Sequence, residues 1–530
     1  MRSIYLYSFI GLCLCFFSSC SDNTDVKDVE SGDMTKEIII DANQTFQTIE
    51  GFAASDCWAP QYVGKYWDDD VKLAISRSLF SQEITGNTPK GIGLSMWRFN
   101  LGGGTAEQGD ASGIVDKSRR AECFLQEDGT LDWNHQLGQQ YFLQKAFEFG
   151  CRKFVMFSNT PPVYYTNNGK GYSAMGAYSN LKEGFYESFA DYITDVLDYF
   201  KKNRNIDFSL ISPVNEPQYN WNDPSQEGSG WQNSEIKQLV VDLDQSLRNK
   251  GLATKILLPE VADWEYAYKR KNDVGRSDCI NNIFNSSSAN YLGDLETVYQ
   301  AIAGHSYWTD RTWNNLYDVR SQLATAASAH NLKVYQTEWS MLGDGYNENY
   351  PGHDNASYMD IALYMSKVIY ADMTFANASS WSYWTSMDVE RWGHKSRFLL
   401  IKLNPAGGAY GDISESGTYE STKNLWVLGN YSLFIRPGYQ RINLSIANAS
   451  NLFFGSAYLS PDKNKLVAVY TNLSDKSIAL NTTFRGLSKE FSSVKRYVTS
   501  QVKDLEGEDL ENDHCTIQPK SVMTLVYELK

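Results

Sequence analysis

Two glutamates stand in contexts suited to acid–base chemistry. Glu216 lies in Ile-Ser-Pro-Val-Asn-Glu-Pro (211–217), and Glu338 lies in Val-Tyr-Gln-Thr-Glu-Trp (334–339). Each follows a short apolar run of β-prone residues, so each is expected where a strand meets its loop. Two carboxyl groups in one pocket can divide the work of glycosidic bond cleavage between an acid/base and a nucleophile. An arbitrary glutamate is usually a surface acid, but the flanking Trp, Tyr, Asn and Gln side chains favour a pocket.

Both glutamates belong to a pattern in which short β-like runs alternate with longer amphipathic segments. The β-like runs are at residues 51–58, 91–102, 153–162, 207–217, 255–264, 301–308, 333–340 and 378–385. Helical patterns lie between them, for example at 139–149, 185–202, 234–249, 319–330 and 357–371. Eight strand-then-helix units predict an α/β fold of the (β/α)8 TIM-barrel type. A doubly wound open sheet is the alternative, but functional-looking residues end nearly every run, which favours the barrel.

The pattern changes near Pro437. Short alternating segments then follow at 443–447, 452–459, 466–472, 477–483, 493–498 and 521–529. They predict a C-terminal all-β sandwich over residues 438–530, beside a catalytic barrel over 51–437. Residues 37–50 read as two N-terminal strands, and we expect them to join the sandwich because an isolated strand pair is barely stable.

The N-terminal residues have the composition of an export signal. Arg2 precedes a mostly apolar stretch, which ends in Ser-Ser-Cys at 18–20. This pattern predicts a signal peptide over residues 1–19 and resembles a bacterial lipoprotein signal with lipidation at Cys20; an ordinary signal peptide is the alternative. Residues 20–36 are polar and acidic and are expected to form a disordered tether. We therefore expect an outer-membrane lipoprotein on the cell surface, with the periplasmic face as the alternative.

Composition excludes several classes of function. The net charge of −15 argues against nucleic acid as a partner. Five scattered cysteines after Cys20 form no CxxC pair, and the six histidines form no HExxH motif, so no metal site or cofactor is predicted. Aromatic residues make up 14% of the chain, including 34 Tyr, which suits stacking on sugar rings without proving it.

The motifs at the strand ends resemble a known family. Asn-Glu-Pro (215–217) on the fourth strand, with Glu338 on the seventh, resembles the clan of retaining (β/α)8 glycosidases. The flanking sandwich makes residues 37–530 similar to glycoside hydrolase family 30. Phe-Ser-Asn-Thr-Pro-Pro (157–162) looks most like the matching segment of its endo-β-1,6-galactanases. The resemblance implies that Glu216 is the general acid/base and Glu338 the nucleophile, with carboxyl groups about 5–5.5 Å apart.

Other strand-end residues are candidates for binding substrate. Arg98 suits a cationic partner of Glu338, and Tyr307 suits a hydroxyl donor to it; a structural ion pair and a core ring are the alternatives. The remaining candidates are Asn215 for a sugar 2-hydroxyl, Trp384 as a platform under the sugar, and Asn159, Trp58, Trp308 and Asp56. Glu260 and Asp263 are rival carboxylates that lack the Asn-Glu-Pro context.

We therefore expect a monomeric retaining β-glycoside hydrolase whose partner is an extracellular polysaccharide or oligosaccharide, with a lipid anchor in the outer membrane. An endo-β-1,6-galactanase is the favoured identity. Action on β-1,6-glucan or xylan, or exo-action, is the alternative among enzymes. A non-catalytic glycan-binding lipoprotein is the alternative of another class, although a binder has no need of two convergent carboxylates.

Overall fold

The computed structural model describes residues 34–173, 176–343, 348, 350–393, 395–487, 490–511 and 515–530. The expected signal peptide, Cys20 and the tether up to residue 33 lie outside the described residues. Residues 34–36, which we assigned to the tether, instead begin strand β1 (Met34–Thr48), where Met34 pairs with Ile478.

Strand β1 also replaces the two short strands expected over residues 37–50. The carboxylate of Asp41 accepts hydrogen bonds from the backbone and side-chain nitrogens of Asn43, each at 3.0 Å. The pairing of β1 with its neighbour shifts register between Asp41 and Thr45. The polar residues that suggested a turn thus form a bulge within one strand.

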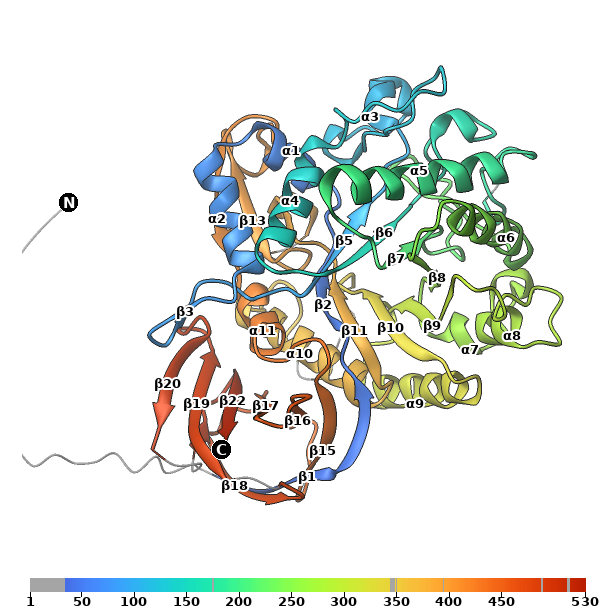
Figure 1. Cartoon of the computed structure of the whole chain (residues 1–530). Helices are drawn as coiled ribbons and strands as arrows, with labels where there is room; N and C mark the ends of the chain where they lie inside the picture. The colour runs from blue at the N-terminus through green and yellow to red at the C-terminus, as the bar shows by residue number, and fades with distance from the viewer. Residues whose placement is uncertain are drawn as a thin grey trace, which may run out of the picture.

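Eight parallel strands form the barrel (Figure 1). They are β2 (Gly51–Ala54), β5 (Met96–Asn100), β6 (Lys153–Phe157), β7 (Leu210–Ser212), β8 (Lys255–Val261), β9 (Val298–His305), β10 (Lys333–Glu338) and β11 (Ala378–Tyr383). Their order is β2-β11-β10-β9-β8-β7-β6-β5, and a parallel bridge between Ser55 and Arg98 joins the two ends. The backbone N–H of Asp56 also donates to the carbonyl of Arg98 at 3.1 Å. The predicted barrel is confirmed, and the open sheet is excluded.

Helices cover the outside of the barrel (Figure 1). The longer ones are α1 (Ala59–Tyr66), α2 (Asp69–Phe80), α4 (Leu137–Glu148), α5 (Tyr186–Arg204), α6 (Asn233–Asn249), α9 (Trp313–Ala329), α10 (Tyr358–Thr374) and α11 (Lys423–Ser432). Helix α6 buries Ile236, Leu239, Leu243 and Leu247, a helical spacing that directs one apolar stripe at the core. At the start of α10, Ser357 and Asp360 form a capping box.

Short elements lie in the connections. The α-helices are α3 (Thr105–Gln108), α7 (Glu265–Tyr268) and α8 (Cys279–Phe284), and the 3₁₀ turns are η1 (Gly109–Ser112), η2 (Lys117–Arg119), η3 (Val163–Tyr165), η4 (Val274–Arg276), η5 (Glu390–Trp392) and η6 (Gly408–Tyr410). The strands are β3 (Ile84–Thr85), β4 (Thr88–Pro89), β12 (Met387–Asp388), β13 (Ile401–Pro405) and β14 (Gly417–Ser421). The last three form a small sheet after β11.

The second domain is a nine-stranded sheet of order β20-β19-β22-β17-β16-β15-β1-β18-β21. Its C-terminal strands are β15 (Gln440–Ile446), β16 (Phe453–Leu459), β17 (Lys465–Asn472), β18 (Ile478–Arg485), β19 (Phe491–Thr499), β20 (Glu506–Leu510), β21 (Cys515–Ile517) and β22 (Ser521–Leu529). Although four strands separate β18 from β22, the ring of Phe484 in β18 lies 5.3 Å from that of Tyr527 in β22. The sheet therefore folds over its own apolar face, which is the predicted flanking β-sandwich.

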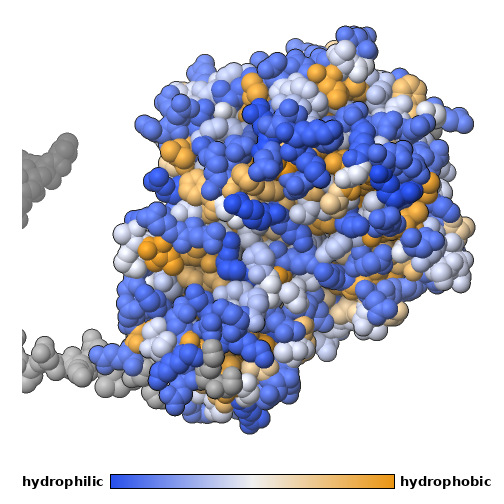
Figure 2. Space-filling view, viewed as in Figure 1, coloured by the Kyte–Doolittle hydropathy of each residue, from blue (hydrophilic) through white to orange (hydrophobic). Residues whose placement is uncertain are grey.

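Helices α10 and α11 lie between the barrel and the β-sandwich (Figure 1). The side-chain amide of Asn430 in α11 donates to the hydroxyl of Thr524 in β22 at 2.9 Å. Figure 2 shows a surface on which hydrophilic residues predominate and hydrophobic residues appear in separate patches. Among the described residues, no helix combines the length and the apolar character that crossing a bilayer requires.

Candidate active site

Charged side chains from several strands meet at the carboxyl-terminal end of the barrel. Arg98 comes from β5, His305 from the last residue of β9 and Glu338 from the last residue of β10, while Glu216 follows β7. Glu216 has a left-handed backbone (φ +43°), which is uncommon for a residue other than glycine. Its backbone N–H donates to the carbonyl of Glu260 at 3.0 Å, a contact that helps to hold this conformation.

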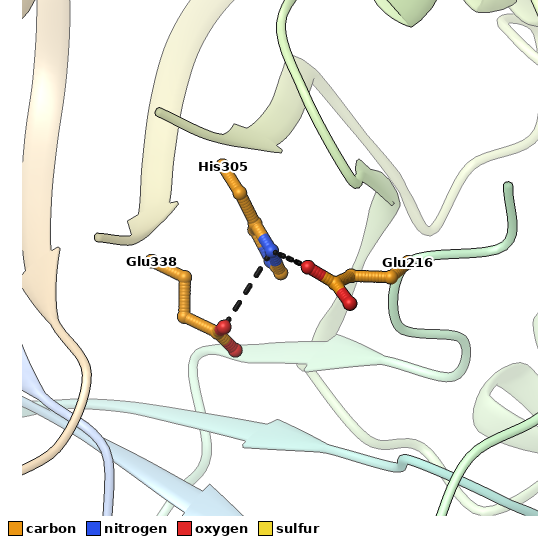
Figure 3. Close-up of side chains that lie close together, drawn as sticks. All are labelled: Glu216, His305 and Glu338. Carbon is orange, nitrogen blue, oxygen red and sulfur yellow. Dashed lines mark hydrogen bonds and ion pairs between the residues drawn. The ribbon is translucent and has the colours of Figure 1, made fainter. Parts of the chain in front are cut away.

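The two predicted catalytic carboxylates lie close together, with His305 beside both (Figure 3). One oxygen atom of Glu216, one of Glu338 and a ring nitrogen of His305 all lie within 4.8 Å of one another. Nδ1 of His305 is 2.9 Å from Oε1 of Glu216 and 3.5 Å from Oε2 of Glu338. This spacing is compatible with two carboxyl groups that act on the same bond.

Glu338 is buried and held by two donors that we expected from the sequence. Nη1 of Arg98 donates to Oε1 at 2.7 Å, and the hydroxyl of Tyr307 donates to Oε2 at 3.1 Å. Burial raises the pKa of Glu338, while the positive charges of His305 and Arg98 oppose that rise. The carboxylate is thus fixed in orientation, but its charge is incompletely compensated.

His305 was not among the predicted site residues, although it lies at the centre of the cluster. Burial alone would lower its pKa, yet the charge of Glu338, the hydrogen bond with Glu216 and the nearby carboxylate of Glu260 raise it to about 10. The ring is therefore a cation at neutral pH. Its position at a strand end in His-Ser-Tyr-Trp (305–308) was the signal available in the sequence, since no histidine motif surrounds it.

Glu260, one of the two rival carboxylates, also joins the cluster, but it has no exposed surface. Nη2 of Arg98 donates to Oε2 of Glu260 at 2.5 Å. Burial would raise the pKa of Glu260, but the charges of Arg98 and His305 lower it overall. Glu260 is thus a buried counter-ion. The other rival, Asp263, pairs with Lys271 at 3.2 Å.

Three further predicted residues lie in the interior around these charges. The side-chain oxygen of Asn215 accepts a hydrogen bond from Nη2 of Arg98 at 2.9 Å. The amide of Asn159 donates to the side-chain oxygen of Asn100 at 3.2 Å. Asp56 has no exposed surface, and Oδ1 accepts from the backbone N–H of Asn100 at 2.7 Å, while burial raises its pKa to about 8. Through this bond Asp56 supports strand β5, and its contact with substrate stays a prediction.

The predicted tryptophans differ in exposure. Trp384 is half-buried and packs edge-on against Trp58, with ring centroids 5.2 Å apart. Trp58 is 3% exposed, so it supports Trp384 more than it offers a surface of its own. Trp308 is 48% exposed. The sequence reasoning missed Tyr219, a ring that lies shortly after Glu216 and is 57% exposed.

Two carboxylates and an imidazole could also form part of a metal site. Here Glu216, His305 and Glu338 are joined by hydrogen bonds and ion pairs, and Arg98 already neutralises part of the charge of Glu338. A fixed guanidinium beside a ligand atom repels a metal cation. The cluster is therefore better suited to proton transfer and nucleophilic attack than to holding an ion.

The chain was compared with known proteins. The profile of O-Glycosyl hydrolase family 30 matches residues 35–395. An endo-beta-1,6-galactanase of Hypocrea rufa is 24% identical over 428 residues, which are 78% of this chain and 77% of the relative.

Solved structures share the fold. A conserved exported protein from Bacteroides fragilis is 29% identical, with a TM-score of 0.85 over 93% of this chain and all of its own length. The catalytic domain of the family 30 xylanase C from Talaromyces cellulolyticus is 18% identical, with a TM-score of 0.64 over 93% of this chain and 99% of its own.

Proposed function

Because the chain belongs to O-glycosyl hydrolase family 30, we propose that it is a retaining endo-β-1,6-galactanase in which Glu216 is the acid/base and Glu338 the nucleophile. The observation that carries this proposal is the approach of one oxygen of each carboxylate to within 4.8 Å of the other at the carboxyl end of the barrel. Retaining enzymes need this short spacing, because the nucleophile must reach the anomeric carbon whose leaving oxygen the acid protonates.

In the first step, Oε2 or Oε1 of Glu338 attacks the anomeric carbon, and the bond from that carbon to the leaving oxygen breaks. Glu216 gives its proton to the leaving oxygen. In the second step, Glu216 takes a proton from water, the water oxygen bonds to the anomeric carbon, and the ester bond to Glu338 breaks. The configuration at that carbon is inverted twice and is therefore retained.

The neighbouring residues suit these separate roles. Arg98 and Tyr307 hold Glu338 as an oriented carboxylate. Nδ1 of His305 forms a hydrogen bond with Oε1 of Glu216 at 2.9 Å and fixes the orientation of this carboxyl group. Trp384 would lie under the sugar in the cleaved subsite, and Asn215 would receive its 2-hydroxyl.

The choice of galactan rests on two observations. One is the similarity to an endo-beta-1,6-galactanase along most of both chains. The other is the segment 157–162, which begins at the last residue of β6 and includes Asn159, whose amide donates to the side chain of Asn100. Galactose and glucose differ by one axial hydroxyl, and a site that hydrogen-bonds this group can discriminate strongly.

The decisive experiment is hydrolysis of debranched β-1,6-galactan and of β-1,6-glucan under identical conditions, with the products separated by chromatography. We expect short galacto-oligosaccharides and little product from the glucan, and the β-anomer should appear first by NMR. Comparable kcat/KM on the glucan would reject galactan specificity, and monosaccharide alone would indicate exo-action. No product from any polysaccharide or activated aryl glycoside would favour a glycan-binding protein instead.

We also propose that the chain works as a monomeric lipoprotein of the outer membrane, anchored through Cys20 and facing external polysaccharide. The apolar stretch before Ser-Ser-Cys and the acidic residues after it support this. A Cys20→Ala variant should leave the membrane fraction while the specific activity is unchanged. Retention of that variant in the membrane fraction would contradict the anchor.

A further inference from the structure

A cavity of about 900 Å³ lies among the loops that follow β5, β7 and β11. These loops contribute residues 115–118, 223–225, and 391–392 with 410–414. Because they extend from the carboxyl ends of barrel strands, the cavity opens on the same end of the barrel as the two catalytic glutamates. Its volume is in the range of pockets that take drug-sized ligands. Neither Glu216 nor Glu338 lines it, so it is separate from the reacting centre.

A continuous series of contacts joins the cavity to the proposed sugar platform. Trp384 packs against Trp58, and the guanidinium of Arg119 lies 4.5 Å from the ring centre of Trp58. The same guanidinium lies 4.2 Å from the ring centre of Trp392, which lines the cavity. Arg119 is fixed by an ion pair with Asp388 at 3.2 Å. The cavity therefore lies beside the proposed platform, with the largely buried side chains of Trp58 and Arg119 between them.

The walls of the cavity are already held in place. Arg391 donates to the carbonyl of Ala409 at 3.0 Å and to a carboxylate oxygen of Asp116 at 3.2 Å. It also donates to the hydroxyl of Ser118 at 3.3 Å. One guanidinium thus ties the loop after β5 to the loop after β11, so little ordering should be needed on binding.

The lining has the composition that binds sugars. Tyr62, Trp392 and Tyr410 supply aromatic rings, and Tyr410 is 84% exposed.

The charges of the lining select the kind of sugar. Its acids are Asp116, Asp223 and Asp412, and its bases are Lys117 and Arg391. Arg391 is already paired with Asp116, so the lining offers more unpaired negative than positive charge. An acidic sugar would be repelled, whereas a neutral one could stack on the rings and use the carboxylates as acceptors.

We propose that this cavity is a remote subsite for neutral sugar units of an extended glycan, several units from the bond that is cut. The proposal rests on the proposed function for the identity of the glycan. It implies that long substrates gain affinity that short ones cannot, because they reach both the cleaved subsite and the cavity.

The test compares substrates of different length. kcat/KM is measured for wild type, Trp392→Ala and Tyr410→Ala on β-1,6-linked galacto-oligosaccharides of increasing length and on a nitrophenyl β-galactoside. We expect each variant to lose about tenfold on the long oligosaccharides and little on the nitrophenyl substrate. Tyr317→Ala is the matched control, because Tyr317 on α9 is also an exposed ring, at 54%. Equal losses on all substrates, or none on the long ones, would overturn the subsite.

A binding measurement separates this proposal from the hydrolase proposal. Galacto-oligosaccharides are titrated into Glu338→Gln while tryptophan fluorescence is followed, and the titration is repeated with Trp392→Ala added. Binding that weakens with the second substitution supports the subsite even if no substrate is cleaved. If wild type hydrolyses galactan but the second substitution leaves binding unchanged, the subsite fails and the proposed function stands.

Discussion

The two ends of the barrel each carry a cluster of charged side chains, but the clusters are built differently. At the amino-terminal end, the carboxylate of Glu50 accepts hydrogen bonds from the ammonium groups of Lys153 and Lys333 and from the hydroxyls of Tyr299 and Tyr335. One acid is surrounded by two cations and two neutral donors. At the carboxyl-terminal end, the acids Glu216, Glu260 and Glu338 share the two cations Arg98 and His305.

The pKa values express this difference. Burial would raise the pKa of Glu50, but the charge of Lys153 and the donors around it lower the value to about 2. At the other end, burial raises the pKa of Glu338 in spite of Arg98 and His305. Complete compensation stabilises the fold, whereas incomplete compensation leaves a carboxylate that can react. Position in the barrel and charge balance together therefore distinguish the cluster at the amino-terminal end from the one that we propose to be catalytic.

The largest expected effect comes from removing the charge of Glu338. Glu338→Gln keeps the shape of the side chain but cannot form the glycosyl ester, so kcat on galactan should fall by about 10⁴-fold or more. Glu50→Gln, the same change at the opposite end, should leave kcat within about twofold, since Glu50 lies at the end of the barrel away from the reaction. Initial rates with both purified variants check this. Similar losses in the two variants would break the distinction between the two ends.

Removing the acid should have a smaller effect that depends on the leaving group. Glu216→Ala should lower kcat on galactan by about 10²–10⁴-fold, the range of general acid–base catalysis. A nitrophenyl substrate needs little acid help in the first step, so its glycosyl-enzyme should form and accumulate. Azide should then restore turnover through the vacated space and give a glycosyl azide of retained configuration. Inverted product from Glu216→Ala, together with retained product from a truncated Glu338 variant, would instead exchange the two roles.

Much of the fold could be predicted because its signals are local. Each barrel strand is a short apolar run with helical spacing after it, and the end of each run marks where chemistry sits in a barrel. Glu216 and Glu338 stood out because both close such runs. We assigned Met34 to the tether because its strand partner, Ile478, is far along the chain. No local sequence pattern indicates strand pairing over such a distance.

The charge cluster could be predicted only in part, because barrel closure creates it. Arg98 and Glu338 are 240 positions apart, and Arg98 and Glu260 are 162 apart. No sequence motif surrounds His305. Its position between the carboxylates is set by the register in which β9 pairs with the neighbouring strands. Asp56 and Trp58 follow the first barrel strand, a position typical of residues that bind substrate, which is why the sequence suggested them. In the structure both side chains are packed among their neighbours and have almost no exposed surface.

The amino-terminal cluster should show itself in stability. Glu50→Gln leaves two lysines without their shared anion, so the free energy of unfolding at pH 7 should fall by about 2–3 kcal/mol. The pKa of Glu50 is depressed from 4.5 to about 2, so its contribution is complete above pH 4.5 and is lost as the pH falls towards 2. Urea unfolding of wild type and variant at several pH values checks this. A difference that grows below pH 4.5 would contradict the sign.

The smallest expected effect sharpens the comparison at the catalytic end. His305→Gln can still hydrogen-bond Glu216 but removes a positive charge that opposes the rise in the pKa of Glu338. The nucleophile should then ionise at higher pH, so the acidic limb of kcat/KM should move up by about one pH unit, with roughly tenfold lower activity on that limb. His330→Gln is the control, because His330 follows α9 near the amino-terminal end of β10 and should not alter the profile. If the acidic limb moves to lower pH, His305 does not act as a cation. If activity falls equally at every pH and the limb does not move, His305 only holds the two carboxylates in position.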